Sequence, residues 1–125
     1  MSNRVLIVDD SKLARMAVIR VLSGLHPDWS TEEASNSEQA LSSFKQNPPD
    51  FVLLDFNMPG KDGLSLASEL RELDPSVCVA VISANHQKEV INRAQAVGAT
   101  FLPKPLTDKA LSDFLTTAHP TKGRA

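Results

Sequence analysis

The chain has 125 residues, of which 42% are hydrophobic and 22% are charged, and its formal net charge at pH 7 is −2. This composition predicts one globular domain, and the small negative charge offers no basic surface for unaided nucleic-acid binding. No hydrophobic run approaches the roughly 18 residues of a membrane span. The N-terminus leads almost directly into a hydrophobic run, so we expect no signal peptide and a cytoplasmic location.

Four short hydrophobic runs show no alternation with polar residues, which is the pattern of strands buried on both faces of a parallel sheet. These runs are residues 5–8, 51–54, 77–82 and 100–102. The more polar segment 29–34 is predicted to form an edge strand.

The stretches between the predicted strands carry hydrophobic residues at helical spacing. We expect Ser11, Ser37 and Thr107 to be helix N-caps, with further helices after Asp62-Gly63 and over about residues 87–97. Five alternating strand–helix units predict a single α/β domain with a doubly wound parallel sheet over residues 1–118. Residues 119–125 have almost nothing to bury and are predicted to be a flexible tail.

Polar side chains follow the predicted strands where each run ends. Asp9 and Asp10 follow the first run, Asp55 follows residues 51–54, Ser83 follows 77–82, and Lys104 lies just past the last run. Open α/β sheets bind ligands at the carboxyl ends of their strands. A single aspartate after a strand is usually a solvated turn residue. The occurrence of all these polar residues at one edge of the sheet indicates a ligand-binding site.

Three clustered carboxylates repel one another, so they must hold a proton or bind a cation, and an all-oxygen set favours Mg²⁺ over Zn²⁺. Asp55 can act as a nucleophile toward phosphorus and form an aspartyl phosphate. Asp9 and Asp10 would then hold the Mg²⁺ that neutralises charge on the phosphoryl group. Lys104 and the Ser83 hydroxyl are suited to phosphoryl oxygens.

These motifs resemble the receiver domain of bacterial two-component response regulators, the fold of the chemotaxis receiver CheY. The resemblance extends over about residues 4–118 and predicts a stand-alone receiver domain with a flavodoxin-like (βα)5 fold and strand order 2-1-3-4-5. The motifs are highly specific in combination, and they are Val8-Asp9-Asp10-Ser11, Leu53-Leu54-Asp55-Phe56-Asn57-Met58-Pro59-Gly60 with Asp62-Gly63, Val81-Ile82-Ser83-Ala84, and Lys104-Pro105.

The resemblance implies a signalling domain in which Asp55 accepts a phosphoryl group from a phosphohistidine on a sensor kinase or phosphotransfer protein. Asp10, Asp55 and the backbone carbonyl of Asn57 would bind Mg²⁺ directly, and Asp9 would act largely through water. Lys104 would contact the phosphoryl group, and its peptide bond to Pro105 is expected to be cis.

The resemblance also implies a conformational switch. Ser83 would move toward the phosphoryl oxygen and Phe101 would swing inward behind it, although ordinary core packing explains Phe101 equally well. Asn57 and Asn85 are expected to influence hydrolysis of the acyl phosphate. A downstream protein would dock on the face of the fourth helix, last strand and last helix. That face offers a mixed polar set: Gln87, Lys88, Asn92, Gln95, Lys109 and Asp113.

Three other functions are compatible with an α/β fold. A flavodoxin would need a hydroxyl-rich phosphate loop where this chain has Asp9-Asp10, which would repel a phosphate. A phosphatase with an aspartyl nucleophile commonly carries a second acid two residues later, where this chain has Asn57. A receiver-like binding module that works without phosphorylation usually lacks the acidic or lysine positions that are present here.

Overall fold

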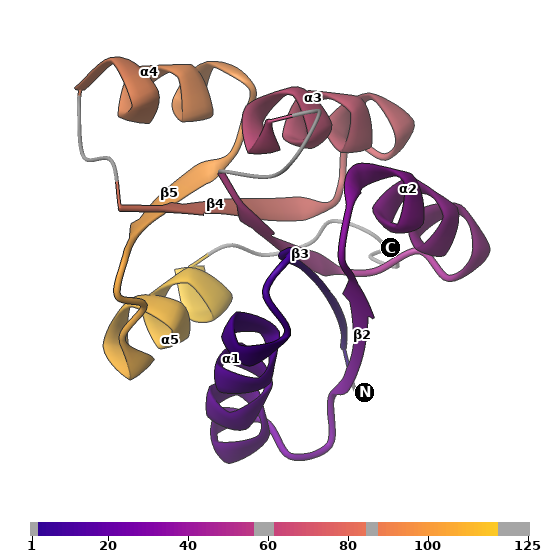
Figure 1. The fold of residues 1–125 in the computed structure, drawn as a ribbon, viewed down its shortest axis with the longest axis vertical. Helices are drawn as coiled ribbons and strands as arrows, with labels where there is room; N and C mark the ends of the chain where they lie inside the picture. Colours follow the sequence, from indigo (N-terminus) through magenta and orange to yellow (C-terminus); the bar gives the residue numbers. More distant parts are fainter. Residues whose placement is uncertain (1–2, 57–61, 85–87, 118–125) are drawn as a thin grey trace.

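A computed structural model describes residues 3–56, 62–84 and 88–117, in which five strands alternate with five helices (Figure 1). None of the helices in this part of the chain is long and apolar enough to cross a membrane. The elements, in chain order, are β1 Arg4–Val8, α1 Lys12–Leu25, β2 Ser30–Ala34, α2 Ser37–Gln46, β3 Phe51–Asp55, α3 Gly63–Leu73, β4 Cys78–Ser83, α4 Lys88–Ala96, β5 Thr100–Pro103 and α5 Asp108–Thr117.

The strands form one parallel sheet in the order β2-β1-β3-β4-β5, which confirms the predicted doubly wound topology. The register aligns the carboxyl ends of the strands. Val8 pairs with Ala34 on one side and with Leu54 on the other, and Asp55 pairs with Ile82. The residues that directly follow β1 and end β3 and β4 therefore meet at one edge of the sheet.

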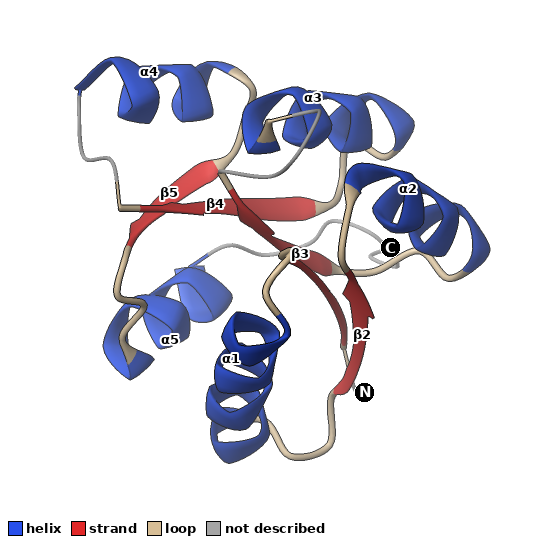
Figure 2. Cartoon of the chain, viewed as in Figure 1, coloured by secondary structure: helices blue, strands red, loops and turns tan. Residues whose placement is uncertain are grey.

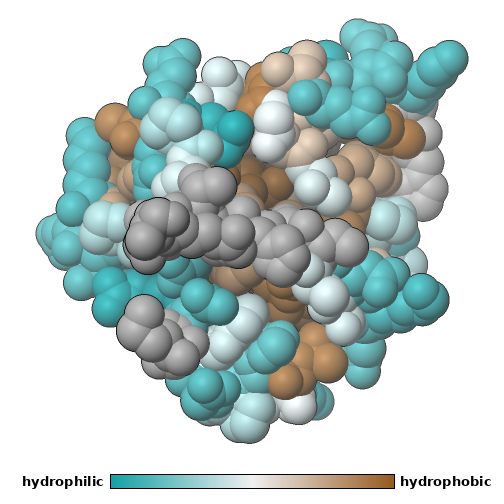
Figure 3. Space-filling model, turned by 180° about the vertical axis from the view of Figure 1, so that it is seen from behind, coloured by the Kyte–Doolittle hydropathy of each residue, from teal (hydrophilic) through white to brown (hydrophobic). Residues whose placement is uncertain are grey.

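The sheet separates two layers of helices, with α2, α3 and α4 on one face and α1 and α5 on the other (Figure 2). Successive residues along a strand pack against opposite layers of helices. Leu6 and Val8 pack in the core under α2, α3 and α4, whereas Val5 and Ile7 pack in the core with α1 and α5. Burial on both faces explains why the strand sequences are continuously hydrophobic. On the side opposite to Figure 1, hydrophobic residues are visible in several places among the hydrophilic ones (Figure 3).

The helix N-caps agree with the predictions at two positions and differ at one. Ser11 and Thr107 accept hydrogen bonds from the backbone N–H groups of Ala14 and Ala110 respectively, as capping residues do. The prediction of Ser37 as the cap of α2 is wrong. Asn36 is the cap, because its backbone is extended and its side-chain oxygen accepts the Gln39 N–H at 2.8 Å, while Ser37 is already helical.

Candidate functional site

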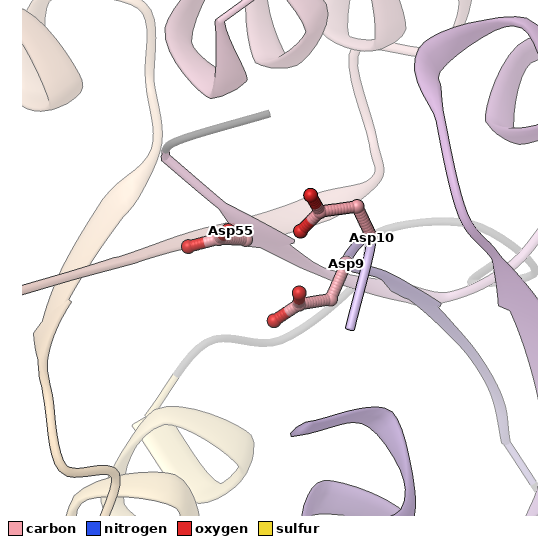
Figure 4. A group of neighbouring side chains, drawn as sticks. All are labelled: Asp9, Asp10 and Asp55. Atoms are coloured by element: carbon pink, nitrogen blue, oxygen red, sulfur yellow. The ribbon is translucent and has the colours of Figure 1, made fainter. Parts of the chain in front are cut away.

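Three carboxylates converge at the carboxyl edge of the sheet (Figure 4). Asp9 and Asp10 directly follow β1, and Asp55 is the last residue of the neighbouring strand β3. Each side chain offers one oxygen, and these oxygens lie within 4.8 Å of one another. Asp55 is buried, Asp9 is half-buried and Asp10 is exposed, so the cluster reaches from the core to the surface.

Lys104 forms an ion pair with Asp55 across the edge of the sheet. The Nζ of Lys104 donates a hydrogen bond to Oδ1 of Asp55 at 2.8 Å. Asp55 ends β3 and Lys104 directly follows β5, and β4 lies between these strands, so the long lysine side chain reaches past the end of β4. The Asp55 side chain is only 6% exposed, and a carboxylate so buried requires a partner charge or cation.

Ser83 lies between Asp55 and Lys104 at the end of β4 and is fully buried. Its carbonyl accepts the backbone N–H of Lys104 at 3.0 Å, and the carbonyl of Ile82 accepts the N–H of Phe56 at 2.9 Å. These bonds continue the sheet just beyond the strands. They hold the backbone of the lysine and the segment after Asp55 in fixed positions relative to Ser83.

Electrostatics at the cluster favour a bound cation. Burial raises the pKa of the Asp9 carboxyl above its ordinary value of 3.8, a hydrogen bond from the Ser11 backbone N–H at 2.9 Å opposes this, and the nearby Asp55 charge raises the pKa further. The donors are hard carboxylate oxygens at the ends of two adjacent strands, and such oxygens are the ligands that Mg²⁺ prefers. The three aspartates therefore fit an Mg²⁺ site.

A groove of about 550 Å³ opens beside the carboxylates. It runs between α1 and the segment that follows β5, with Asp9 and Lys104 among its polar lining residues and Val18, Val21 and Leu106 among its apolar ones. The lining is mainly apolar, although the groove adjoins the charged edge of the sheet.

Several residues singled out in the sequence lie elsewhere or outside the described part. Asn57, Asn85 and Gln87 are outside the described residues. Phe101 is half-buried in β5 and packs against the core that includes α3 and α4. The Lys104–Pro105 peptide bond is cis, as expected.

The sequence indicated Gly63 only as part of the Asp62-Gly63 motif before the third helix, and the structure makes it the first residue of α3. A Cβ at this position would lie 2.7 Å from the carbonyl oxygen of Asp55 and 2.9 Å from the Cα of Phe56. The Gly63 N–H donates to the Phe56 carbonyl at 2.9 Å, so α3 starts in direct contact with the end of β3. A glycine at the start of a helix, where it is less favoured than at the end, was the available signal.

Arg15 was also missed. Its Nη1 donates to the backbone carbonyl of Asp9 at 2.5 Å, and its Nε donates to Oε1 of Glu33 at 2.9 Å. No local pattern indicates these contacts, because the partner carboxylate is 18 residues away on another strand.

Comparisons with known proteins agree on one family. A family model described as the response regulator receiver domain matches residues 5–116. The chemotaxis protein CheY of Bacillus subtilis is 35% identical over 108 residues, which cover 84% of this chain and 88% of that protein. Sporulation initiation phosphotransferase F of the same organism is 29% identical and matches over 98% of both chains.

Some relatives are longer than this chain, and solved structures of similar proteins have the same fold. The chain is 34% identical to the nitrate/nitrite response regulator NarL of Escherichia coli K12 but spans only 52% of it. Among solved structures, the chemotaxis protein CheY4 of Vibrio cholerae has a TM-score of 0.85 at 26% identity, covering 94% of this chain and 99% of that one. A putative response regulator from Chloroflexus aurantiacus has a TM-score of 0.86 at 25% identity, covering 94% and 98%.

Proposed function

The chain belongs to the response regulator receiver family, and on this premise we propose that Asp55 accepts a phosphoryl group from a phosphohistidine of a sensor kinase or phosphotransfer protein. The arrangement of Asp55 is the observation that carries the proposal. Its carboxylate is buried at the end of a central strand, lies 2.8 Å from the Nζ of Lys104, and belongs to a cluster with Asp9 and Asp10.

The transfer needs one nucleophile and a way to bind the charged phosphoryl group. A carboxylate oxygen of Asp55 attacks phosphorus while the bond from phosphorus to the donor imidazole breaks. The electron pair of that bond stays on the imidazole nitrogen, which takes up a proton. Lys104 contacts a phosphoryl oxygen from its present position beside Asp55, and the Ser83 hydroxyl donates to another oxygen after a short movement.

When bound, Mg²⁺ supplies positive charge that stabilises the transferring phosphoryl group and relieves repulsion among the carboxylates. Asp10 and Asp55 would hold it directly together with the Asn57 carbonyl, and Asp9 would act largely through water. The oxygen donors of the three aspartates lie close enough together to serve one ion.

Phosphorylation would act on a partner protein through the α4–β5–α5 face. Ser83 and Phe101 would form the switch between Asp55 and that face. The exposed residues there carry charges of both signs, which suits a polar protein contact. They include Lys88, Asn92, Gln95, Lys109 and Asp113. A cytoplasmic location fits a phosphoryl donor that is a sensor kinase or phosphotransfer protein and a target that is a downstream protein.

The acceptor is tested by incubating the protein with acetyl phosphate and Mg²⁺ and weighing the intact chain by mass spectrometry. We expect one added phosphoryl group on the wild type, none on Asp55→Asn, and none when a chelator is present. Asp28→Asn is the matched control, because Asp28 is an exposed acid outside the carboxylate cluster. Full labelling of Asp55→Asn would refute Asp55 as acceptor, and repeated turnover of phosphate esters would indicate the aspartyl phosphatase instead.

A further inference from the structure

The side chain of Arg15 connects three elements next to the carboxylate cluster. Arg15 lies in the first turn of α1 and its side chain is only 14% exposed. One nitrogen of its guanidinium donates to the backbone carbonyl of Asp9, and another donates to Glu33 on β2. Arg15 therefore ties the turn between β1 and α1 to the neighbouring strand.

The carbonyl that Arg15 holds belongs to the peptide unit joining Asp9 to Asp10. Because a peptide unit is planar, fixing its oxygen also restricts the direction in which the Cα of Asp10 is placed. The preceding peptide unit is fixed as well, since the Asp9 N–H donates to the carbonyl of Ala34 at 3.1 Å. Both peptide planes around Asp9 are thus anchored, one to β2 directly and the other through Arg15.

We propose that Arg15 is a positioning residue that presents Asp9 and Asp10 to Mg²⁺, an inference that rests on the function proposed above. Carboxylates whose oxygens lie within 4.8 Å of one another repel, so without the ion the turn that carries two of them needs an independent anchor. Arg15 supplies this anchor through the backbone and is not itself a ligand.

A guanidinium is suited to this role because its planar fork can donate to the carbonyl and to Glu33 at the same time, in fixed geometry. A lysine ammonium at the same position is a point charge on a flexible stem and would not hold both acceptors in that geometry. Partners that orient metal ligands typically change metal affinity about 10- to 100-fold when removed. We expect Arg15→Ala to be near the lower limit, because Arg15 holds the backbone and not a ligand atom.

The test measures the Mg²⁺ dissociation constant of the full chain by titration calorimetry, together with the thermal midpoint in chelator. Arg15→Ala should bind Mg²⁺ about tenfold more weakly than the wild type, and Arg15→Lys should fall in between. Glu33→Gln keeps an oxygen acceptor for Nε and should stay close to the wild type. Arg20→Ala is the matched control, because it removes the same charge from an exposed position on the same helix.

The outcomes separate positioning from simple stabilisation. If Arg15→Ala lowers the thermal midpoint in chelator but binds Mg²⁺ as tightly as Arg20→Ala, Arg15 is only structural and the inference is overturned. If Arg15→Ala does not fold, an unchanged affinity in Arg15→Lys overturns it equally. A wild-type chain that does not bind Mg²⁺ at all contradicts the proposed function as well, which distinguishes the two failures.

Discussion

The two ends of β3 differ in chemistry although both are buried. Phe51 opens the strand and lies in a stack of rings, whereas Asp55 closes it among charged side chains. Only the three residues 52–54 separate a site built for packing from one built for chemistry. The difference shows how one short strand can be held firmly at one edge of the sheet and still present a reactive carboxylate at the other.

At the amino edge, aromatic rings connect the end of α1 to α5. His26 stacks on Trp29 with ring centroids 3.8 Å apart, and Trp29 stacks on Phe51 at 5.4 Å. Phe51 in turn meets the ring of Phe114 edge-on at 5.8 Å. Ring contacts of this geometry add to the ordinary gain from burying apolar surface. The amino edge therefore stabilises the fold.

At the carboxyl edge, the charged carboxylate of Asp9 opposes folding when no cation is bound, because burial and the nearby Asp55 charge raise the pKa of Asp9. We infer that this edge depends on stability supplied elsewhere in the domain. Three substitutions sharpen the comparison, in order of the size of their expected effect on stability.

Phe51→Ala should have the largest effect, a loss of about 3–5 kcal/mol in the free energy of unfolding, because it opens a cavity among fully buried side chains. Chemical denaturation measures the loss, and Phe51→Leu should cost less. Labelling of Asp55 by acetyl phosphate should persist in the fraction that remains folded. Loss of labelling from folded Phe51→Ala would show that the two edges are not independent.

Gly63→Ala should have an intermediate effect, destabilising by about 1–3 kcal/mol, because the new methyl group collides with the backbone of Asp55 and Phe56. It should also slow labelling of Asp55, since relief of the collision displaces the acceptor. Gly24→Ala is the control. Gly24 lies in α1 with nothing within 4 Å of its Cβ position, so alanine should stabilise by roughly 0.5–1 kcal/mol. Equal labelling rates in both variants would contradict this view of Gly63.

Asp9→Asn should have the smallest effect on the free energy of unfolding, and it should stabilise the protein where the other two substitutions destabilise it. The pKa of Asp9 is raised in the folded protein, so the folded state holds this proton more tightly than the unfolded state does. That stabilising contribution is complete below about pH 4 and is lost as the pH rises through the folded-state pKa. At pH 7 the charged carboxylate is destabilising, and asparagine should add under about 1 kcal/mol because Asp9 is only half-buried.

The measurement for Asp9→Asn is the thermal midpoint in chelator between pH 3 and pH 8. The wild type should lose stability relative to the variant as the pH rises. Added Mg²⁺ should make the wild type the more stable of the two, because the ion binds the wild type more tightly. Parallel pH profiles for the two proteins would contradict a raised pKa at Asp9.

Much of the fold was predictable because its signals are local. Continuous hydrophobic runs located β1, β3, β4 and β5 to within about one residue, since strands buried on both faces admit few polar residues. The prediction of the α2 cap failed because Asn36 and Ser37 are both good capping residues. Only the extended backbone at Asn36 decides between them.

The amino-acid sequence by itself determined the strand–helix alternation and the placement of Asp9, Asp10, Asp55 and Lys104 at strand ends, because hydrophobic periodicity and position within a run are properties of neighbouring residues. The tertiary structure alone decided which distant groups meet. The 2.8 Å contact of Lys104 with Asp55 spans 49 residues, and Arg15 on α1 contacts both the Asp9 carbonyl after β1 and Glu33 on β2. Such contacts depend on sheet register and side-chain direction, which arise only when the strands have paired.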